Sequence, residues 1–138
     1  MLVFLRIIAA GTEDVIGDRL LLAGGFDTTT TELMPVDGGE SEPSFHLNPG
    51  RYGHCSIQPS PTTIILTGGS ETPSLVTEYS GVGGPVEEVT TRELPSLKQG
   101  RDLHACGVYD RVRTVYCVSI LLTLLLTDSH SGGWLLST

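Results

Sequence analysis

Short apolar runs separated by turn-forming residues make up most of this chain. The two clearest, residues 20–25 (LLLAGG) and 64–69 (IILTGG), each end in a pair of glycines. An apolar run of four to eight residues bounded by glycine, proline and polar residues is typical of a buried β-strand. We therefore predict a strand in each run and a turn that begins at the glycines.

The two runs belong to a larger repeated pattern. Each glycine pair is followed by a threonine-rich turn, a Thr-Glu dipeptide and a Gly-Arg-x-x-His motif, in that order. The three landmarks recur at intervals of 44, 46 and 50 residues, which predicts a tandem structural repeat. The landmark residues are Gly24, Gly25, Gly68, Gly69, Arg51, His54, Arg101 and His104.

Each repeat unit reads as four strands rather than helices, because prolines and glycines interrupt the apolar runs. Prolines fall between or at the ends of these runs, where a missing N–H does least harm to a β-ladder. We therefore predict an all-β fold in which every unit is a small four-stranded antiparallel sheet. The expected strands of the second unit are 54–58, 62–67, 75–79 and 86–94.

Composition supports this interpretation and excludes some partners. The 138 residues include 17 glycines and 8 prolines, so turns are frequent and long helices are not expected. A net charge of −8 repels phosphate backbones and acidic lipid surfaces, which argues against nucleic acid and against a membrane as partner. The only lysine, Lys98, follows a leucine, so the Gly-Lys pair of a P-loop is absent.

The two ends of the chain differ from the repeat. Residues 1–10 are apolar but place Arg6 inside the run, which favours a buried strand over a signal peptide. The second apolar run, residues 114–127, has 14 residues without a charge and is shorter than a membrane-spanning helix. We expect a core segment, a marginal membrane segment or a divergent tail there. No N-glycosylation sequon suggests secretion, and a cytoplasmic location is favoured over a secreted one.

The repeated residues resemble the Kelch repeat over about residues 20–109. The shared features are a strand ending in a glycine pair, a following strand with Glu78-Tyr79, and a small-Arg-x-x-His opening of the next unit. The resemblance implies a β-propeller in which each repeat forms one four-stranded blade. It also implies a non-enzymatic protein-binding scaffold without a cofactor. The chain departs from the family in lacking a tryptophan about six residues after Tyr79.

The resemblance divides the chain into three parts. Residues 1–19 form a lead-in that includes a possible strand of a preceding blade, residues 20–110 hold two repeats, and residues 111–138 form a divergent tail or an interrupted third repeat. Propellers need about 4 to 8 blades to close, so we expect a fragment that cannot close a ring alone. Exposed blade edges and faces favour self-association.

Several of the distinctive residues have structural or chemical alternatives. We expect the glycine pairs to allow close approach of neighbouring backbone. For Arg51 and Arg101 we expect a turn-fixing hydrogen bond or a buried ion pair, with a channel-lining role as the alternative. His54 and His104 could join Cys55 and Cys106 in a zinc site, but small cysteines filling buried gaps is the simpler interpretation. We therefore propose no catalytic, cofactor-binding or metal-binding residue from the sequence.

The expected function is recognition of another protein through loops at one end of the blades, residues 26–31 and 70–74. Loops on a rigid scaffold commonly carry binding. The alternatives are a metal-dependent enzyme on a propeller scaffold and a membrane-tethered module anchored by residues 114–127. For the glycine pairs we predict that Gly68→Val costs about 1 to 3 kcal/mol.

Overall fold

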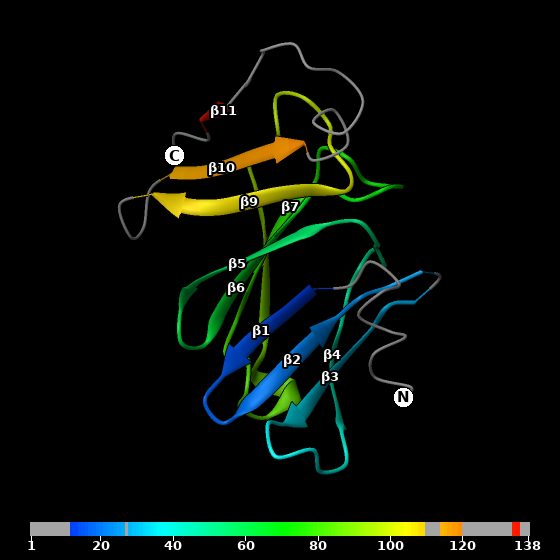
Figure 1. The fold of residues 1–138 in the computed structure, drawn as a ribbon, viewed down its shortest axis with the longest axis vertical. Coiled ribbons are helices and arrows are strands. Elements are labelled where there is room, and N and C mark those ends of the chain that lie inside the picture. The colour runs from blue at the N-terminus through cyan, green and yellow to red at the C-terminus, as the bar shows by residue number, and fades with distance from the viewer. Residues whose placement is uncertain (1–11, 27, 110–113, 120–133, 136–138) are drawn as a thin grey trace.

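The computed structural model describes residues 12–26, 28–109, 114–119 and 134–135, and these residues form an all-β protein. Two four-stranded antiparallel sheets follow each other along the chain, and a three-stranded sheet comes after them (Figure 1). Neighbouring strands in each sheet are consecutive in the sequence, so each sheet is a simple meander. The predicted class of fold, with two four-stranded antiparallel sheets, is confirmed.

The first sheet has the strand order β1-β2-β3-β4 and the second has the order β5-β6-β7-β8. The third sheet has the order β11-β10-β9. The strands are β1 (Thr12–Ile16), β2 (Arg19–Ala23), β3 (Thr30–Pro35), β4 (Glu42–His46), β5 (Cys55–Ser60), β6 (Thr63–Thr67), β7 (Val76–Ser80), β8 (Thr90–Leu94), β9 (His104–Tyr109), β10 (Thr114–Ser119) and β11 (Trp134–Leu135).

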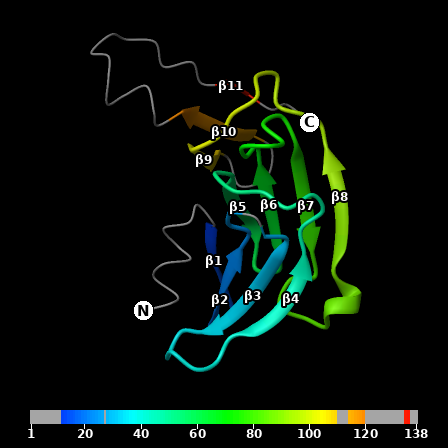
Figure 2. The same cartoon turned by 90° about the vertical axis from the view of Figure 1, so that its right-hand side faces the viewer.

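The four strands predicted for the second unit are present, with one correction in the last. Residues 86–94 were expected to be extended throughout, but Val86–Glu88 is a short 3-10 helix and β8 starts at Thr90. The 3-10 helix is closed by the amide of Val89 donating to the carbonyl of Val86 at 3.2 Å. Its three residues are exposed, so no burial favours an extended conformation there. In Figure 2, β8 runs along the outer edge of the second sheet.

The predicted lead-in contains the first strand of the first sheet. β1 pairs with β2 in a tight hairpin, with Ile16 opposite Arg19 and Val15 opposite Leu20. Gly17 lies in the turn at φ 64°, a conformation that glycine adopts without steric cost. Residues 12–16 therefore belong to the first sheet rather than to a preceding one, whereas residues 1–11 lie outside the described residues.

The third sheet begins at the Gly-Arg-x-x-His motif of residues 100–104, which opens the next unit, and extends into the predicted tail. β9 pairs with β10 from Tyr109 opposite Thr114 to His104 opposite Ser119. The first six residues of the apolar run 114–127 are thus strand β10, and residues 120–127 lie outside the described residues. Among the residues that the structure places, no helix is both long and apolar enough to cross a membrane.

The main apolar core lies between the first two sheets. Buried side chains of β2, β3 and β4 meet those of β6 and β7, and the rings of Phe45 and Tyr79 stack with their centroids 4.7 Å apart. A second, smaller core lies on the other face of the second sheet, so β6 is buried on both faces. The main core comprises Ile16, Leu21, Ala23, Leu33, Phe45, Leu47, Ile64, Leu66, Tyr79 and Val82. The second core comprises Ile57, Ile65, Val76 and Leu97.

The first strands of the three sheets lie side by side, with β5 between β1 and β9 (Figure 1). Polar side chains connect β1 and β5. The Ser56 hydroxyl donates to the Asp14 carboxylate, and the side-chain amide of Gln58 donates to the Val15 carbonyl at 2.7 Å. This arrangement aligns corresponding ends of the sheets, and so it brings corresponding loops together.

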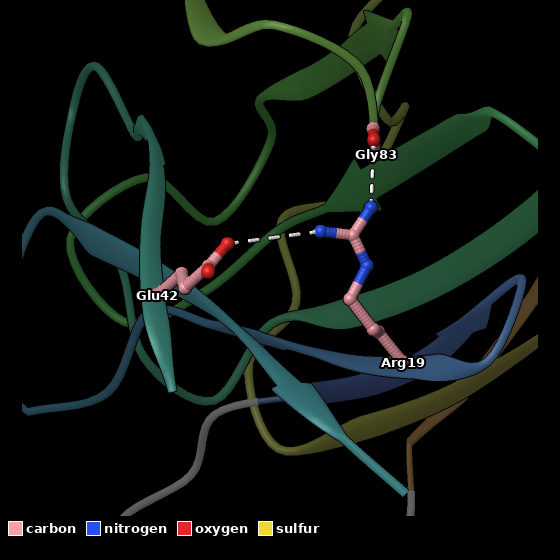
Figure 3. A network of polar contacts seen from close by, with 3 residues as sticks. All are labelled: Arg19, Glu42 and Gly83. Atoms are coloured by element: carbon pink, nitrogen blue, oxygen red, sulfur yellow. Dashed lines mark hydrogen bonds and ion pairs between the residues drawn. The ribbon is translucent and has the colours of Figure 1, made fainter. Parts of the chain in front are cut away.

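Arg19 joins the first two sheets at the start of β2, the opposite end of this strand from the loop that begins at Gly24 (Figure 3). Its Nη2 donates to the carbonyl of Gly83 at 2.7 Å, and its Nη1 lies 4.0 Å from a carboxylate oxygen of Glu42. Because Gly83 is in the turn after β7 and Arg19 starts β2, one side chain spans the interface. The guanidinium thus holds the second sheet's turn against the first sheet.

Candidate functional site

The loops that follow β2 and β6 form the same tight contacts in the first and second sheets. Gly24 and Gly68 have φ angles of 69° and 63°, which glycine alone adopts readily. A Cβ atom at Gly68 would collide with the carbonyl oxygen of Arg101 and lie 2.8 Å from Cε1 of His104. At Gly24 the collision would be with the carbonyl oxygen of Arg51, and with Cε1 of His54 at 2.8 Å. The glycine pairs therefore sit where the next unit's Gly-Arg-x-x-His motif packs.

Backbone hydrogen bonds reproduce this correspondence. The Gly25 amide donates to the Arg51 carbonyl at 3.2 Å, and the Gly69 amide donates to the Arg101 carbonyl at 2.9 Å. The structure thus brings each predicted glycine pair against the motif that follows it in sequence. In both places the contact joins one sheet to the start of the next.

The two motif histidines are buried beside these glycines. Ring atom Nε2 of His104 lies 2.9 Å from Oγ1 of Thr67, at the end of β6. Burial, reinforced by the charge of Arg51, lowers the pKa of His54 from 6.5 to about 4. Burial also lowers the pKa of His104, with Arg101 acting in the same direction. Both rings are therefore neutral near pH 7 and suited to packing against the glycine turns.

Arg51 is buried between the sheets, with 2% of its surface exposed. Its Nη2 donates to Oγ1 of Thr77 on β7 at 2.8 Å, whereas its Nε and Nη1 have no hydrogen-bond partner among the described residues. Burial lowers the pKa of this guanidinium, and the nearby Tyr79 opposes that effect. Of the alternatives for Arg51, the structure shows a buried hydrogen bond, made to a hydroxyl on β7.

Arg101 occupies the corresponding place in the next unit but is less buried. Its amide donates to the carbonyl of Pro73 at 2.7 Å, and its carbonyl accepts the Gly69 amide. The backbone of Arg101 therefore fixes both ends of the loop at residues 69–73. The sequence motif alone could not show this, because the bonding groups are main-chain atoms.

The cysteines correct the sequence interpretation. Cys55 and Cys106 are not separate gap fillers but form a disulfide, with Cα atoms 6.0 Å apart. They are 51 residues apart, and each lies near the start of the first strand of its sheet. The predicted repeat contained part of this information, because its interval of 50 residues matches Cys55 to position 105, one residue before Cys106. Both sulfurs are used in the bridge, so the alternative two-His, two-Cys zinc set lacks its thiolates.

A pocket of about 490 Å³ opens between the two predicted binding loops. Phe26 and the threonines of the first loop form one side, and Glu71 of the second loop lines it as well. Tyr52 extends the aromatic surface, with its ring centroid 5.2 Å from that of Phe26 and the planes tilted by 59°. The lining residues are Gly25, Phe26, Thr28, Thr29, Pro49, Gly50, Arg51, Tyr52 and Glu71.

The aromatic pair makes this pocket the candidate binding site. The Phe26 side chain is 71% exposed, which is unusual for a large apolar ring. Its neighbour Tyr52 was not singled out from the sequence, although an aromatic residue directly after the motif arginine was a usable signal. Tyr79, which the sequence marked as a position of the repeat, lies in the main core.

The site shows no arrangement that points to a metal. Across the described part of the chain, no three His, Cys, Asp or Glu side chains gather closely enough to hold an ion. The pocket lining offers two aromatic residues, two threonines, a proline, Arg51, the Glu71 carboxylate and glycine backbone. No protein-family model matches the chain, and no curated protein is significantly similar to it.

Proposed function

We propose that the protein is a non-enzymatic interaction module that binds a protein partner through the pocket between residues 26–31 and 70–74. The observation that carries this proposal is the convergence of both loops on one pocket with the exposed Phe26 beside Tyr52. Aromatic side chains supply large contact area at low entropy cost and are enriched at the energetic centres of protein interfaces. The pocket would receive a partner side chain, with Glu71 at its rim.

The rigidity of the loops supports a binding role. The Leu47 amide donates to the carbonyl of Thr29 at 2.7 Å, and the Ser70 amide donates to the carbonyl of Tyr52 at 3.0 Å. Each bond ties a pocket segment to a part of the chain that is distant in sequence. A surface ordered before binding loses less conformational entropy when the partner docks. Such anchoring suits recognition of a defined partner shape.

We further propose that the sheets are blades of a Kelch-type propeller. Support comes from the consecutive four-stranded meanders, the adjacent first strands β1, β5 and β9, and the contact set shared by Gly24 and Gly68. A propeller of about 4 to 8 blades presents the corresponding loops of all blades at one end. Two complete sheets and a partial third are too few for closure, so further blades or self-association would complete the ring.

The test compares two exposed apolar residues at opposite ends of the first sheet. Phe26 follows β2 at the pocket, whereas Val36, 61% exposed, follows β3 at the far end. The full chain carrying a photo-crosslinking amino acid at either position is exposed to extract from its source cells, and the crosslinked proteins are identified. A protein crosslinked from Phe26 and not from Val36 is the expected result.

Affinity for that protein is then measured with Phe26→Ser and the matched control Val36→Ser. Loss of one pocket aromatic should weaken binding at least tenfold, because interface aromatics commonly contribute more than about 1.4 kcal/mol. Val36→Ser should bind as the wild type does. Unchanged affinity of Phe26→Ser, or equal weakening by both variants, would show that the pocket is not the binding site.

A further inference from the structure

The Cys55–Cys106 disulfide connects β5 to β9, the first strands of the second and third sheets. The disulfide joins two sheets to each other, whereas the hydrogen bonds within a sheet do not, because β5 and β9 belong to different sheets. The described residues place no such bond between the first two sheets. The bridge is therefore specific to one of the two interfaces.

The bridge lies beside the apolar core on this face of the second sheet. Ile57, Ile65, Val76 and Leu97 are buried there, with Leu94 and Cys106 packed against them. Cys106 therefore joins the third sheet to the second both through the disulfide and through its contact with this core.

The same region supports one side of the candidate binding pocket. The Leu103 amide donates to the carbonyl of Gly53 at 2.7 Å, and the Ser70 hydroxyl donates to Asp102 at 3.4 Å. The Leu103 bond attaches residues 101–104 to the loop that carries Tyr52. The Ser70 bond to Asp102, and the bonds that Arg101 makes to both ends of the loop at 69–73, attach them to the loop that carries Glu71. The strand β9 begins at His104, so displacement of β9 would release the loop at residues 69–73.

We propose that the Cys55–Cys106 bond is a redox-sensitive clasp that holds the third sheet and the 70–74 loop in place. When the bond forms, the two cysteine thiols transfer two protons and two electrons to a disulfide oxidant, such as oxidised glutathione or a protein disulfide. The oxidant is reduced to two thiols as its own S–S bond breaks. A dithiol reductant reverses the reaction by thiol–disulfide exchange and is itself oxidised to a disulfide. Both cysteines are half-buried, so a small reductant can reach the bond.

The clasp also bears on the compartment in which the protein works. Disulfides persist in oxidising environments and are rare where glutathione and thioredoxin keep thiols reduced. A chain that needs this bridge to hold its third sheet would be fully assembled in an oxidising compartment, contrary to the cytoplasmic location expected from the sequence. This inference does not depend on the proposed binding function.

The first measurement is a thiol count on the full chain purified without reductant. Alkylation under denaturing conditions should modify one of the three cysteines before reduction and all three afterwards. Peptide mapping should assign the protected pair to Cys55 and Cys106. Modification of all three before reduction, or a protected pair that includes Cys117, would overturn the proposal.

The second measurement is hydrogen exchange of the folded chain with and without dithiothreitol. Reduction should accelerate exchange at least tenfold in β9 and at residues 68–71, while β2 and β3 keep their protection. The double variant Cys55→Ser/Cys106→Ser should show the same pattern without reductant, and Cys117→Ser should respond as the wild type does. Unchanged exchange in β9, or equal acceleration throughout all three sheets, would contradict a local clasp.

Discussion

The two interfaces between the sheets are built on the same plan but are stabilised differently. Both place a glycine turn against the next unit's arginine carbonyl and histidine ring. Between the first and second sheets, ten buried side chains and the Arg19 bond to Gly83 supply the stabilisation. Between the second and third, the described contacts include a disulfide and the contact between the His104 ring and the Thr67 hydroxyl, beside a second apolar core.

This difference shows that two interfaces can share the same backbone geometry while different side-chain contacts stabilise them. The glycine turn needs only a backbone conformation and an open space, which the motif reproduces in each unit. The side chains that fill the interface can vary, as Ala23 at the end of β2 and Thr67 at the end of β6 show. Alanine offers no side-chain hydroxyl, and His54 instead hydrogen-bonds to the backbone of Arg51 and Ala23, whereas the threonine hydroxyl meets His104 directly.

Adjacent residues of β6 provide the strongest test of this comparison. Ile64 is fully buried in the main core and Ile65 is buried in the smaller one. We expect Ile64→Ala to lower the free energy of unfolding by about 4 kcal/mol and Ile65→Ala by about 2 kcal/mol, because the cost rises with the contacts and cavity involved. Urea denaturation followed by far-UV circular dichroism measures both. Equal losses, or a larger loss for Ile65→Ala, would contradict a ranking that rests on Ile64 being fully buried and Ile65 being 9% exposed.

The shared glycine turn is tested by Gly68→Val. The new side chain would be forced to adopt a positive φ and to displace the carbonyl of Arg101, so we expect a loss of about 3 kcal/mol, the upper end of the range predicted from the sequence. Gly17→Ala is the control, since Gly17 has φ 64° and no atom within 4 Å of an added Cβ. That variant should cost about 1 kcal/mol from backbone strain alone. Denaturation midpoints measure the stability of both variants. Equal midpoints would contradict the role of Gly68 in the turn.

The buried histidine of the first interface predicts a pH dependence. Because burial lowers the pKa of His54 to about 4 in the folded protein, the unfolded chain binds more protons between pH 6.5 and pH 4. The stabilisation is complete above pH 6.5 and is lost as the pH falls to about 4, by about 2 to 3 kcal/mol. His54→Gln should flatten the dependence of unfolding free energy on pH in this window.

Urea denaturation across that pH range measures the effect of His54, with His46→Gln as the control for removing an exposed histidine. His46 lies on β4 and its side chain is exposed, so its replacement leaves the buried site intact. A slope for His54→Gln that matches the wild-type slope would show that another group dominates acid destabilisation.

Most of the strand pattern could be predicted because its causes are local. Apolar residues at 20–22 and 64–66, with glycines directly after them, specify strands and turns whatever the rest of the chain does. The exceptions are also informative. The repeat landmarks begin only at residue 20, so residues 12–16 fell within the predicted lead-in, and their place in the first sheet rests on the pairing of β1 with β2.

The candidate pocket could be predicted in part. Loops 26–31 and 70–74 were expected to carry recognition, and both contribute to one pocket. The aromatic contact of Tyr52 with Phe26 could not be derived, because these residues come from different units and meet only when the sheets pack. Similarly, the sequence left both a turn-fixing hydrogen bond and a buried ion pair open for Arg51, and only the packed interior shows the Thr77 hydroxyl as a partner.

The order of strands and the sites of the turns follow from the sequence of apolar, glycine and proline residues, since each depends on neighbours within a few positions. The disulfide, the partner of Arg51 and the pocket depend on which strands lie beside one another. That choice is made when the sheets bury their apolar faces, a long-range event to which all of the strands contribute. Cys55 and Cys106 meet only because β5 and β9 are neighbours in the packed protein.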